Sequence, residues 1–561
     1  MFNALLPPSL ILILGALALP AISIRLRPFL LVGLPLIALA QIWSYDLGSA
    51  HAMNFLDYQL IPLKVDALSR LFTTIFAIMA CVGGLYALNQ KRIIELVAAF
   101  VYAGSAIGVT MAGDLITVFV FWEIMAIAST LVIWSADTNT AYKASMRYIL
   151  IHLLGGVILM AGIVWLAASS GSIEFTAMQA TSPATWLILI GFLLNAGAPP
   201  LSGWLPDAYP ETSYSGAVFL SAFTTKTAVY VLIRGFPGEE ILIFIGLYMI
   251  FYGIIYALLE NDMRRILAYS IINQVGFMIT GIGIGTEMAL NGAAAHAFTH
   301  IIYKALLLMS AGSVLYVTGK RKCTDLGGLF RTMPLTMVCG AIGALSISSF
   351  PLTSGFISKS MIAQAAADGQ MLTVWMFLCA ASAGVFLHAG IKFPWFVFFQ
   401  KDSGLRPPEP PKNMRIAMII MATFCIALGI LPGFLYAILP YPVSYIPYTA
   451  DHVLRMLQLL LFSGLAFFLL LPMMKRTMTI SLDFDWFYRY VGVELNNFLV
   501  KLFSANIIKF RDYAVLQMLT LKNIIIRYLG PDGTITQTTS LGNMVQWVAI
   551  LLSVYLIIYQ L

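Results

Sequence analysis

Residues 185–206 read TWLILIGFLLNAGAPPLSGWLP, an apolar run interrupted by Asn195 and by the pair Pro199 and Pro200. A run of this length is sufficient to cross a bilayer as a helix. Proline removes a helical hydrogen bond and clashes with the preceding turn. Backbone groups freed in this way are tolerated at membrane depth only inside protein or beside a hydrated cavity. The stretch therefore predicts a membrane helix that breaks halfway, at a place where polar groups gather.

A second stretch shows the same pattern further along the chain. Residues 346–359 read SISSFPLTSGFISK, with Pro351 and Gly355 in the run and Lys359 just beyond them. Because proline cannot continue a helix, we expect a second broken membrane helix here.

Apolar runs of bilayer-spanning length recur along the whole chain. Of the 561 residues, 60% are hydrophobic and only 10% are charged, whereas soluble domains carry about 25% charged residues. We expect about sixteen spans, at residues 4–24, 28–44, 66–88, 93–112, 114–134, 142–169, 185–206, 216–234, 240–259, 264–284, 289–318, 334–364, 371–399, 413–438, 452–473 and 543–560. The sequence therefore predicts an all-α polytopic membrane protein.

The loops between these spans alternate in charge. Lys and Arg concentrate after odd-numbered spans and acidic residues after even-numbered ones, with the acidic loop 207–215 as the exception. Because cytoplasmic loops are rich in Lys and Arg, we expect the loops after odd spans in the cytoplasm and the N-terminus outside. The net charge of +7 comes from single residues in short loops, so we expect no nucleic-acid partner.

The two broken spans are the seventh and the twelfth, five apart. Neighbouring spans match at the same interval: His152 of the sixth corresponds to His296 and His300 of the eleventh. Lys226 of the eighth corresponds to Lys392 of the thirteenth. Two five-helix units, spans four to eight and nine to thirteen, fit this pattern. An odd number of helices per unit gives the copies opposite orientations, as in inverted-repeat transporters with sites at their broken helices.

The same reasoning divides the chain into six parts. They are residues 1–92 (three spans), 93–238 (first repeat), 239–400 (second repeat), 401–473 (two spans), 474–542 (an amphipathic segment) and 543–561 (a last span). The amphipathic segment mixes charged and apolar residues, a composition typical of a chain that lies along the membrane surface. We expect it on the cytoplasmic face.

Ionisable residues lie deep within the predicted spans. They are Glu123, Lys226, His296, His300, Lys304, Lys359 and Lys392. A charge at the bilayer centre costs roughly 2.5–3.5 kcal/mol on insertion scales. These groups must therefore pair, meet water or titrate. Lysine and histidine both change protonation readily when buried, so the row predicts a path for protons.

Structural roles offer an alternative for each residue. Glu123 and Lys226 would serve as a structural ion pair, His296 and His300 as packing histidines, and Lys359 and Lys392 as side chains that reach to the interface. A whole row of titratable groups has no structural use that apolar residues would not serve better.

The five cysteines show no metal-ligand spacing, and haem, iron–sulfur and nucleotide motifs are absent from the sequence. We therefore expect no cofactor, no bound metal and no catalytic residue.

Several motifs that carry these residues resemble the antiporter-like proton-conducting subunits of respiratory complex I and of Mrp-type cation/proton antiporters. The matching stretches are residues 121–125 (FWEIM), 204–210 (WLPDAYP), 224–230 (TTKTAVY), 264–270 (RRILAYS), 274–277 (QVGF), 296–306 (HAFTHIIYKAL) and 351–359 (PLTSGFISK). They span roughly residues 65–400. Residues 482–489 look like the C-terminal region of the D-type subunits of Mrp antiporters.

The resemblance implies about fourteen core helices, inverted repeats, and two half-channels joined by a central polar axis. It implies the family's relay positions for Glu123, Lys226, His296 with His300, and Lys359. One departure concerns the broken seventh helix, where the family places a lysine and this chain has Asn195. An amide binds water but cannot carry a proton as lysine does.

These observations predict a proton-translocating subunit of a multi-subunit Na⁺/H⁺ or other cation/proton antiporter in a bacterial inner membrane. Its partners would be other membrane subunits, with protons and Na⁺ or K⁺ as substrates. One alternative is the proton-pumping arm of a complex I-like NADH-quinone oxidoreductase or membrane hydrogenase, with the redox cofactors on other chains. A stand-alone carrier is a second alternative, and a structural scaffold is a third.

Overall fold

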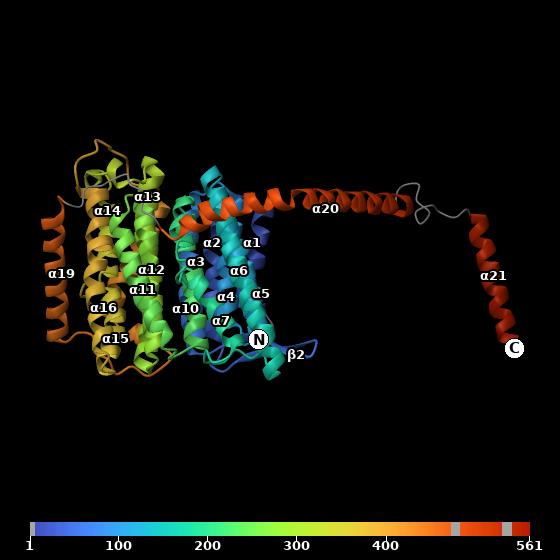
Figure 1. Ribbon diagram of the computed structural model, residues 1–561, viewed down its shortest axis with the longest axis horizontal. Coiled ribbons are helices and arrows are strands. Elements are labelled where there is room, and N and C mark those ends of the chain that lie inside the picture. The colour runs from blue at the N-terminus through green and yellow to red at the C-terminus, as the bar shows by residue number, and fades with distance from the viewer. Residues whose placement is uncertain (1–5, 473–482, 530–540, 561) are drawn as a thin grey trace. The chain divides into compact units, whose positions relative to one another are not determined.

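The computed structural model describes residues 6–472, 483–529 and 541–560 (Figure 1). The chain forms two compact units, Met1–Phe484 and Asp485–Leu561. The first unit begins with α1 (Pro8–Ala18), η1 (Leu19–Ala21), α2 (Arg27–Ser44), β1 (Ala50–Phe55), β2 (Tyr58–Lys64), α3 (Ala67–Tyr86), η2 (Ala87–Asn89), α4 (Ile93–Met111), α5 (Leu115–Trp134) and α6 (Asn139–Ser170).

The middle of the first unit holds the first broken span and the elements around it. These are α7 (Pro183–Ala196), α8 (Trp204–Ala208), η3 (Tyr209–Glu211), α9 (Gly216–Leu220), α10 (Thr224–Gly235), α11 (Ile241–Leu259), α12 (Met263–Ile284), α13 (Glu287–Thr318), η4 (Cys323–Asp325) and η5 (Leu329–Arg331).

The first unit ends with α14 (Pro334–Ile347), α15 (Ser354–Asp368), α16 (Leu372–Val385), the π-helical η6 (Phe386–Lys392) and η7 (Trp395–Phe399), α17 (Lys412–Ile430), α18 (Gly433–Tyr436) and α19 (Ala450–Leu470). Its helices run side by side (Figure 1), and α11 with α12, α4 with α5 and α6 with α7 are closely packed neighbours.

The predicted all-α polytopic fold is confirmed. Within the described residues, 13 helices are long and apolar enough to cross a membrane. Three shorter apolar helices, Pro8–Ala21, Pro183–Ala196 and Pro334–Ile347, complete the set. Together these helices follow the order of the sixteen predicted spans. The division into repeats and domains remains a prediction.

Both predicted breaks are present. The helix α7 starts with a capping box, in which the Ser182 side chain accepts from the amide of Thr185, and it ends at Gly197 with φ 80°. A left-handed residue of this kind commonly closes a helix, and glycine adopts it without strain. Pro199 and Pro200 then separate α7 from α8. In the second break, Pro351 lies between the end of α14 and the start of α15.

Three features were not predicted. Residues 50–64 form an antiparallel hairpin in which Phe55 pairs with Tyr58. The eighth span is interrupted at residues 221–223, between α9 and α10, and the thirteenth span is π-helical around Lys392. The last two irregularities both lie beside a buried lysine.

The acidic loop 207–215 lies on the same side of the bundle as the basic loops after odd spans. Arg147 forms a bidentate ion pair with Asp207, at 2.7 and 2.8 Å, and Arg321 binds the Glu211 carboxylate at 3.0 Å. Its acidic side chains therefore have arginine partners, one from α6 and one from the loop after α13, which accounts for the one exception in the charge pattern.

The second unit contains η8 (Phe487–Val491), the 38-residue helix α20 (Gly492–Leu529) and α21 (Leu541–Gln560). The predicted amphipathic segment is helical from residue 485 to residue 529, whereas residues 474–482 and 530–540 of the segment lie outside the described residues. Its position along the cytoplasmic surface remains a prediction.

Candidate functional site

Glu123 lies in the middle of α5, with its carboxyl group against α6. A β-carbon added at Gly156 would lie 1.9 Å from Glu123 Oε1, so the glycine leaves the space that the carboxyl group occupies. Oε1 is buried without a hydrogen-bond partner among the described residues. A buried polar atom without a partner calls for an explanation, such as a bound water or a functional role.

One turn before Gly156 on α6, His152 is held by the broken helix α7. Its Nδ1 lies 2.7 Å from Asn195 Oδ1, and both residues are buried. The imidazole is packed between two aromatic rings, with centroids at 4.0 Å to Tyr148 and 4.7 Å to Trp204. Trp204 also donates from Nε1 to the carbonyl of Leu194, at 3.2 Å. This carbonyl belongs to the last turn of α7, so a neutral indole caps the first broken helix.

A group of four hydroxyls lies beyond His152; we refer to Tyr102, Ser129, Tyr148 and Thr224 as the hydroxyl cluster. Tyr148 donates to Ser129 Oγ at 3.0 Å and lies 3.4 Å from Thr224 Oγ1. The Tyr102 hydroxyl lies 2.6 Å from the same Thr224 oxygen. The cluster joins α4, α5, α6 and α10. Sequence reasoning missed it, because single hydroxyls on separate helices leave no spacing signal.

Lys226 is fully buried in the first turn of α10, at the middle of the span Gly216–Gly235. Its Nζ donates to the carbonyl of Ser221 at 2.6 Å and to Thr225 Oγ1 at 3.0 Å. Ser221 lies in the interruption between α9 and α10, so the ammonium group binds backbone that the interruption exposes.

The helix α13 contributes three ionisable groups on one face. His296 lies 3.0 Å from Ser358 Oγ through Nδ1 and 3.2 Å from Gln274 Oε1 through Nε2. The Lys304 Nζ donates to the carbonyl of Leu267 at 3.1 Å.

Between them on α13, His300 has no hydrogen-bond partner on either ring nitrogen among the described residues. The helix α13 packs against α10, which carries Lys226, and against α15, which carries Lys359. His300 therefore lies on the helix that joins lysines of the two predicted repeats.

Lys359 is anchored at the second break. Its Nζ donates at 2.8 Å to the carbonyl of Ile347, the last residue of α14. The same Nζ lies 4.8 Å from the centre of the Phe277 ring. Gly355 allows the two half-helices to approach, since a β-carbon there would lie 1.8 Å from the Ser346 carbonyl oxygen. The lysine thus neutralises the carbonyl end of one half-helix while it belongs to the other.

Lys392 binds the carbonyl end of another helix. Its Nζ donates to the carbonyls of Ala257, Leu258 and Glu260, at 3.0, 2.6 and 2.6 Å, at the end of α11. On the same π-helix, His388 bonds through Nδ1 to the carbonyl of Gly384, at 2.9 Å.

Three of the four buried lysines (Lys226, Lys359 and Lys392) therefore bind backbone carbonyls where a helix ends or is interrupted. Such carbonyls carry the negative end of the helix dipole. Within the described part of the chain, none of the four pairs with a carboxylate, so Glu123 and Lys226 are not a structural ion pair. Lys359, at 2% exposure, stays inside the bundle, whereas the Lys392 ammonium group reaches the end of the span Ile241–Leu259.

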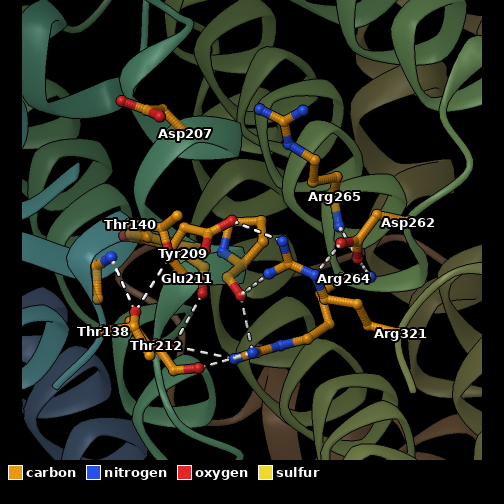
Figure 2. Close-up of polar contacts among 12 residues, drawn as sticks. Thr138, Thr140, Asp207, Tyr209, Glu211, Thr212, Asp262, Arg264, Arg265 and Arg321 are labelled. Atoms are coloured by element: carbon orange, nitrogen blue, oxygen red, sulfur yellow. Dashed lines mark hydrogen bonds and ion pairs between the residues drawn. The ribbon is translucent and has the colours of Figure 1, made fainter. Parts of the chain in front are cut away.

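A second polar cluster, on the side of loop 207–215, was not predicted (Figure 2). Arg264 of α12 donates to the carbonyls of Pro210, Thr212 and Ser213, at 2.7 to 2.8 Å. Arg321 joins Glu211 to Asp262 through ion pairs of 3.0 and 2.9 Å. These contacts fix the loop after the first broken helix to the second predicted repeat.

The fold and this arrangement define a polytopic membrane protein with a buried row of lysines and histidines beside two broken helices. Residues 112–384 match the family described as "NADH:quinone oxidoreductase/Mrp antiporter, TM". The chain is 30% identical over 335 residues to the D subunit of a Na⁺/H⁺ antiporter from Alkalihalophilus pseudofirmus, a match that covers 54% of this chain and 68% of that protein. The chain belongs to this antiporter family.

Two further proteins show how widely the resemblance extends. The chain is 29% identical over 423 residues to the A/B subunit of a probable K⁺/H⁺ antiporter from Rhizobium meliloti, which covers 70% of this chain but only 41% of that protein. The fold matches a chain of the membrane-bound sulfane sulfur reductase, an archaeal respiratory membrane complex, with a TM-score of 0.72 and 23% identity. That match covers 99% of this chain and 100% of the other.

Proposed function

We propose that this chain is the proton-translocating subunit of a multi-subunit monovalent cation/proton antiporter. Protons move along Glu123, Lys226, His296 with His300, Lys304, Lys359 and Lys392. The observation that carries the proposal is that the buried lysines bind only carbonyl and hydroxyl oxygens of the described residues. A lysine held in this way gives its proton to a neighbour without separating an ion pair, whose disruption would leave a buried charge behind.

The position of His300 supports transfer between the two halves. Its ring nitrogens have no hydrogen-bond partner within the described residues, and its helix α13 packs against the helices of Lys226 and Lys359. An imidazole both takes and gives a proton near neutral pH. His300 therefore connects Lys226 with Lys304 and Lys359 in this proposal.

The broken helices are the sites where the path meets the aqueous phase. Asn195, Pro199 and Pro200 form the first, and Pro351 with Gly355 the second. Interrupted helices at corresponding positions of two repeats mark the binding sites of many transporters. The family relationship, and the cation/proton exchange of the two antiporter relatives, support exchange of protons for Na⁺ or K⁺.

The proposal also assigns a location and a role. The chain lies in the inner membrane of a bacterium, with its N-terminus outside, as the charges of its loops favour. It works with other membrane subunits, and it is a transporter subunit rather than an enzyme.

The experiment is cation-driven proton movement in everted membrane vesicles that contain the whole complex. Wild-type chain should dissipate a pre-formed pH gradient when Na⁺ or K⁺ is added. Glu123→Gln and Lys226→Ala should each lower the initial rate by at least about tenfold, since a positioned proton-transfer group contributes about 10²–10⁴. Membrane levels of the subunits should not change. Wild-type rates in both variants would refute the relay.

A second candidate is a proton-pumping subunit of a complex I-like oxidoreductase, which the family description and the fold of the respiratory complex support. The composition of the complex purified with a tagged chain separates the two candidates. Small membrane subunits alone favour the antiporter, and co-purified iron–sulfur subunits favour the redox complex. Cation-driven proton flux from the purified chain by itself would favour a stand-alone carrier.

A further inference from the structure

The two broken helices differ in the titratable groups they bring together. At the second break, Lys359 itself binds the end of α14. At the first break, the end of α7 carries Asn195, which cannot change protonation, and the neutral indole of Trp204 caps the helix. If protons pass from Glu123 to Lys226, a group in the first half must take them in between.

His152 occupies the required position. It lies one turn before Gly156 on α6, and the Glu123 carboxyl group occupies the place of a side chain at Gly156. A helical side chain covers the turn before its own Cα, so the carboxyl group lies over the turn that begins at His152. Asn195 Oδ1 lies beside the same turn, 2.7 Å from His152 Nδ1. A β-carbon added at Gly155 would lie 3.7 Å from this oxygen.

We propose that His152 is the proton-exchanging partner of Glu123 in the first half, and that Asn195 is its positioning residue. This inference rests on the proposed function, and it gives the first broken helix a titratable group that its own sequence lacks.

The hydrogen bond to Asn195 suits this task. The Asn195 amide oxygen accepts a hydrogen bond from His152 Nδ1–H. The lone pair of the ring is then on Nε2, which has no partner among the described residues. The same oxygen continues to accept from Nδ1–H when the ring is protonated, and a bond to a charged donor is the stronger one. Asn195 therefore holds the imidazole in one orientation in both states.

The proton balance is simple. Protonated Glu123 gives its proton to His152 Nε2, which leaves a carboxylate and an imidazolium. The imidazolium then gives that proton to neutral Lys226, which becomes an ammonium, and the imidazole returns to its neutral form. Only O–H and N–H bonds form and break, and one proton has moved from α5 to α10.

The hydroxyl cluster marks the route for the second step. The ring of Tyr148 is in contact with His152, and the Tyr148 hydroxyl lies 3.4 Å from Thr224 Oγ1. Thr224 is two residues before Lys226 on α10. Hydroxyls donate and accept at once, so they pass a proton on without holding a charge.

His388 shows what a packing histidine looks like in this chain. It is also buried, but its Nδ1 bonds to the carbonyl of Gly384, in the preceding turn of its own helix. His152 differs because a side chain from a neighbouring broken helix orients it, beside a carboxyl group that lacks a partner for Oε1 among the described residues.

The test compares His152→Gln with wild type in the same everted vesicles and complex. Glutamine keeps a hydrogen-bonding side chain of similar length but cannot be protonated. The initial rate of cation-driven proton movement should fall by at least about tenfold, with unchanged subunit levels and complex assembly. The matched control is His51→Gln, an exposed residue of β1, which should transport like wild type.

A double variant distinguishes a proton carrier from a packing residue. Asn195→Lys in the His152→Gln background returns a titratable group to the same turn, and it should restore at least about one third of the rate, since proton transfer depends on such a group. Near wild-type transport in His152→Gln would overturn the inference. Loss in the single variant without recovery in the double variant would also overturn it, because a packing role predicts that result.

Failure of the inference is distinguishable from failure of the proposed function. If wild-type complex moves no protons when a cation is added, the proposed function is wrong. If wild type is active, Glu123→Gln is inactive and His152→Gln is active, only the role of His152 is wrong.

Discussion

The two broken helices share a geometry but differ in charge. In each, a proline-containing segment separates two half-helices, and one donor side chain binds a carbonyl in the last turn of the first half-helix. At α14 that donor is the ammonium group of Lys359. At α7 it is the indole of Trp204, beside the neutral pair of His152 and Asn195. A break therefore needs a capping donor, but it does not need a charged one.

This difference divides the work between the halves. Both halves hold lysines on backbone carbonyls without a carboxylate partner among the described residues. The first half combines its lysine with an acid, an imidazole and a hydroxyl cluster, whereas the second half combines lysines with histidines. In our proposal, protons in the first half start from a carboxyl group, and those in the second half pass between histidines and lysines.

The largest expected effect comes from removing the charged cap. Lys359→Met keeps much of the length and volume of the side chain but leaves the Ile347 carbonyl without its donor. Antiport should fall by at least about a hundredfold, within the range for a positioned proton-transfer group, in the vesicle assay at normal subunit levels. Retained transport would show that the second break does not carry protons through Lys359.

Gly156→Ala should be the next most severe change in transport. Its β-carbon would lie 1.9 Å from Glu123 Oε1, so the carboxyl group must leave its place against α6. The rate should fall by about tenfold or more, as expected when a proton-transfer group is misplaced. The control is Gly33→Ala on α2, where nothing lies within 4 Å of the added carbon. Equal rates in the two variants would contradict the assigned position of Glu123.

Each break contains a glycine, so the two breaks can also be compared by how much a substitution there lowers the stability of the complex. Gly355→Ala forces a carbon to 1.8 Å from the Ser346 carbonyl oxygen, and it should destabilise the complex by about 3 kcal/mol or more, at the upper end for overpacking. Gly197→Ala places a side chain at φ 80° with no contact closer than 3.8 Å. Its cost should be about 1–2 kcal/mol, the usual penalty for a left-handed residue.

Thermal unfolding of the detergent-purified complex measures both variants. The Gly355 variant should melt at the lower temperature, and the opposite order would contradict the close approach of α14 and α15.

Removing the neutral cap should have a smaller effect. Trp204→Phe keeps an aromatic ring against His152 but removes one of two donors to the Leu194 carbonyl, which still accepts from the Gly197 amide at 3.1 Å. The cost should be about 0.5–1.5 kcal/mol, the usual net value of one hydrogen bond. Transport should change by less than in Lys359→Met, because no proton carrier is lost. A loss as large as that of Lys359→Met would mean that the two caps are functionally equivalent.

The smallest expected effect concerns the loop after the first break. Burial raises the pKa of Glu211, but the neighbouring Arg321 outweighs it, so the pKa lies below its usual value of 4.5. A lowered folded pKa contributes stability that is complete above the unfolded value and is lost as pH falls through the folded value. The pair is partly exposed, so its contribution should stay below about 1 kcal/mol.

The melting temperature of Glu211→Gln, which leaves the pair of Arg321 with Asp262 in place, should therefore lie slightly below that of wild type at pH 7. The gap should close as the pH is lowered below 4.5. A gap that grows on acidification would contradict this ion pair.

Much of this fold follows from the sequence because membrane spans are long and apolar, and because prolines mark the two breaks. The sixteen spans, both proline breaks and the buried positions of Lys226 and Lys359 could be predicted from composition and spacing, whereas Glu123 is only half-buried. The interruption beside Lys226 could not, because Ser221, Ala222 and Phe223 contain no proline or glycine to mark it.

The capping roles of the lysines were also beyond sequence reasoning. Lys392 binds carbonyls of α11 that are 132 to 135 residues away, and only the packed bundle brings them together. For the same reason, nothing in the sequence connects Asn195 with His152, or Tyr102 with Thr224. The hairpin of β1 and β2 was missed because residues 50–64 lie between two much stronger apolar signals.

The most direct test of the central claim is a high-resolution cryo-EM map of the assembled complex that shows ordered water. The account predicts a chain of hydrogen bonds through water and side chains from Glu123 past His152 to Lys226, and on through His300 to Lys359. Dry, apolar packing between any two neighbours in that chain would contradict it.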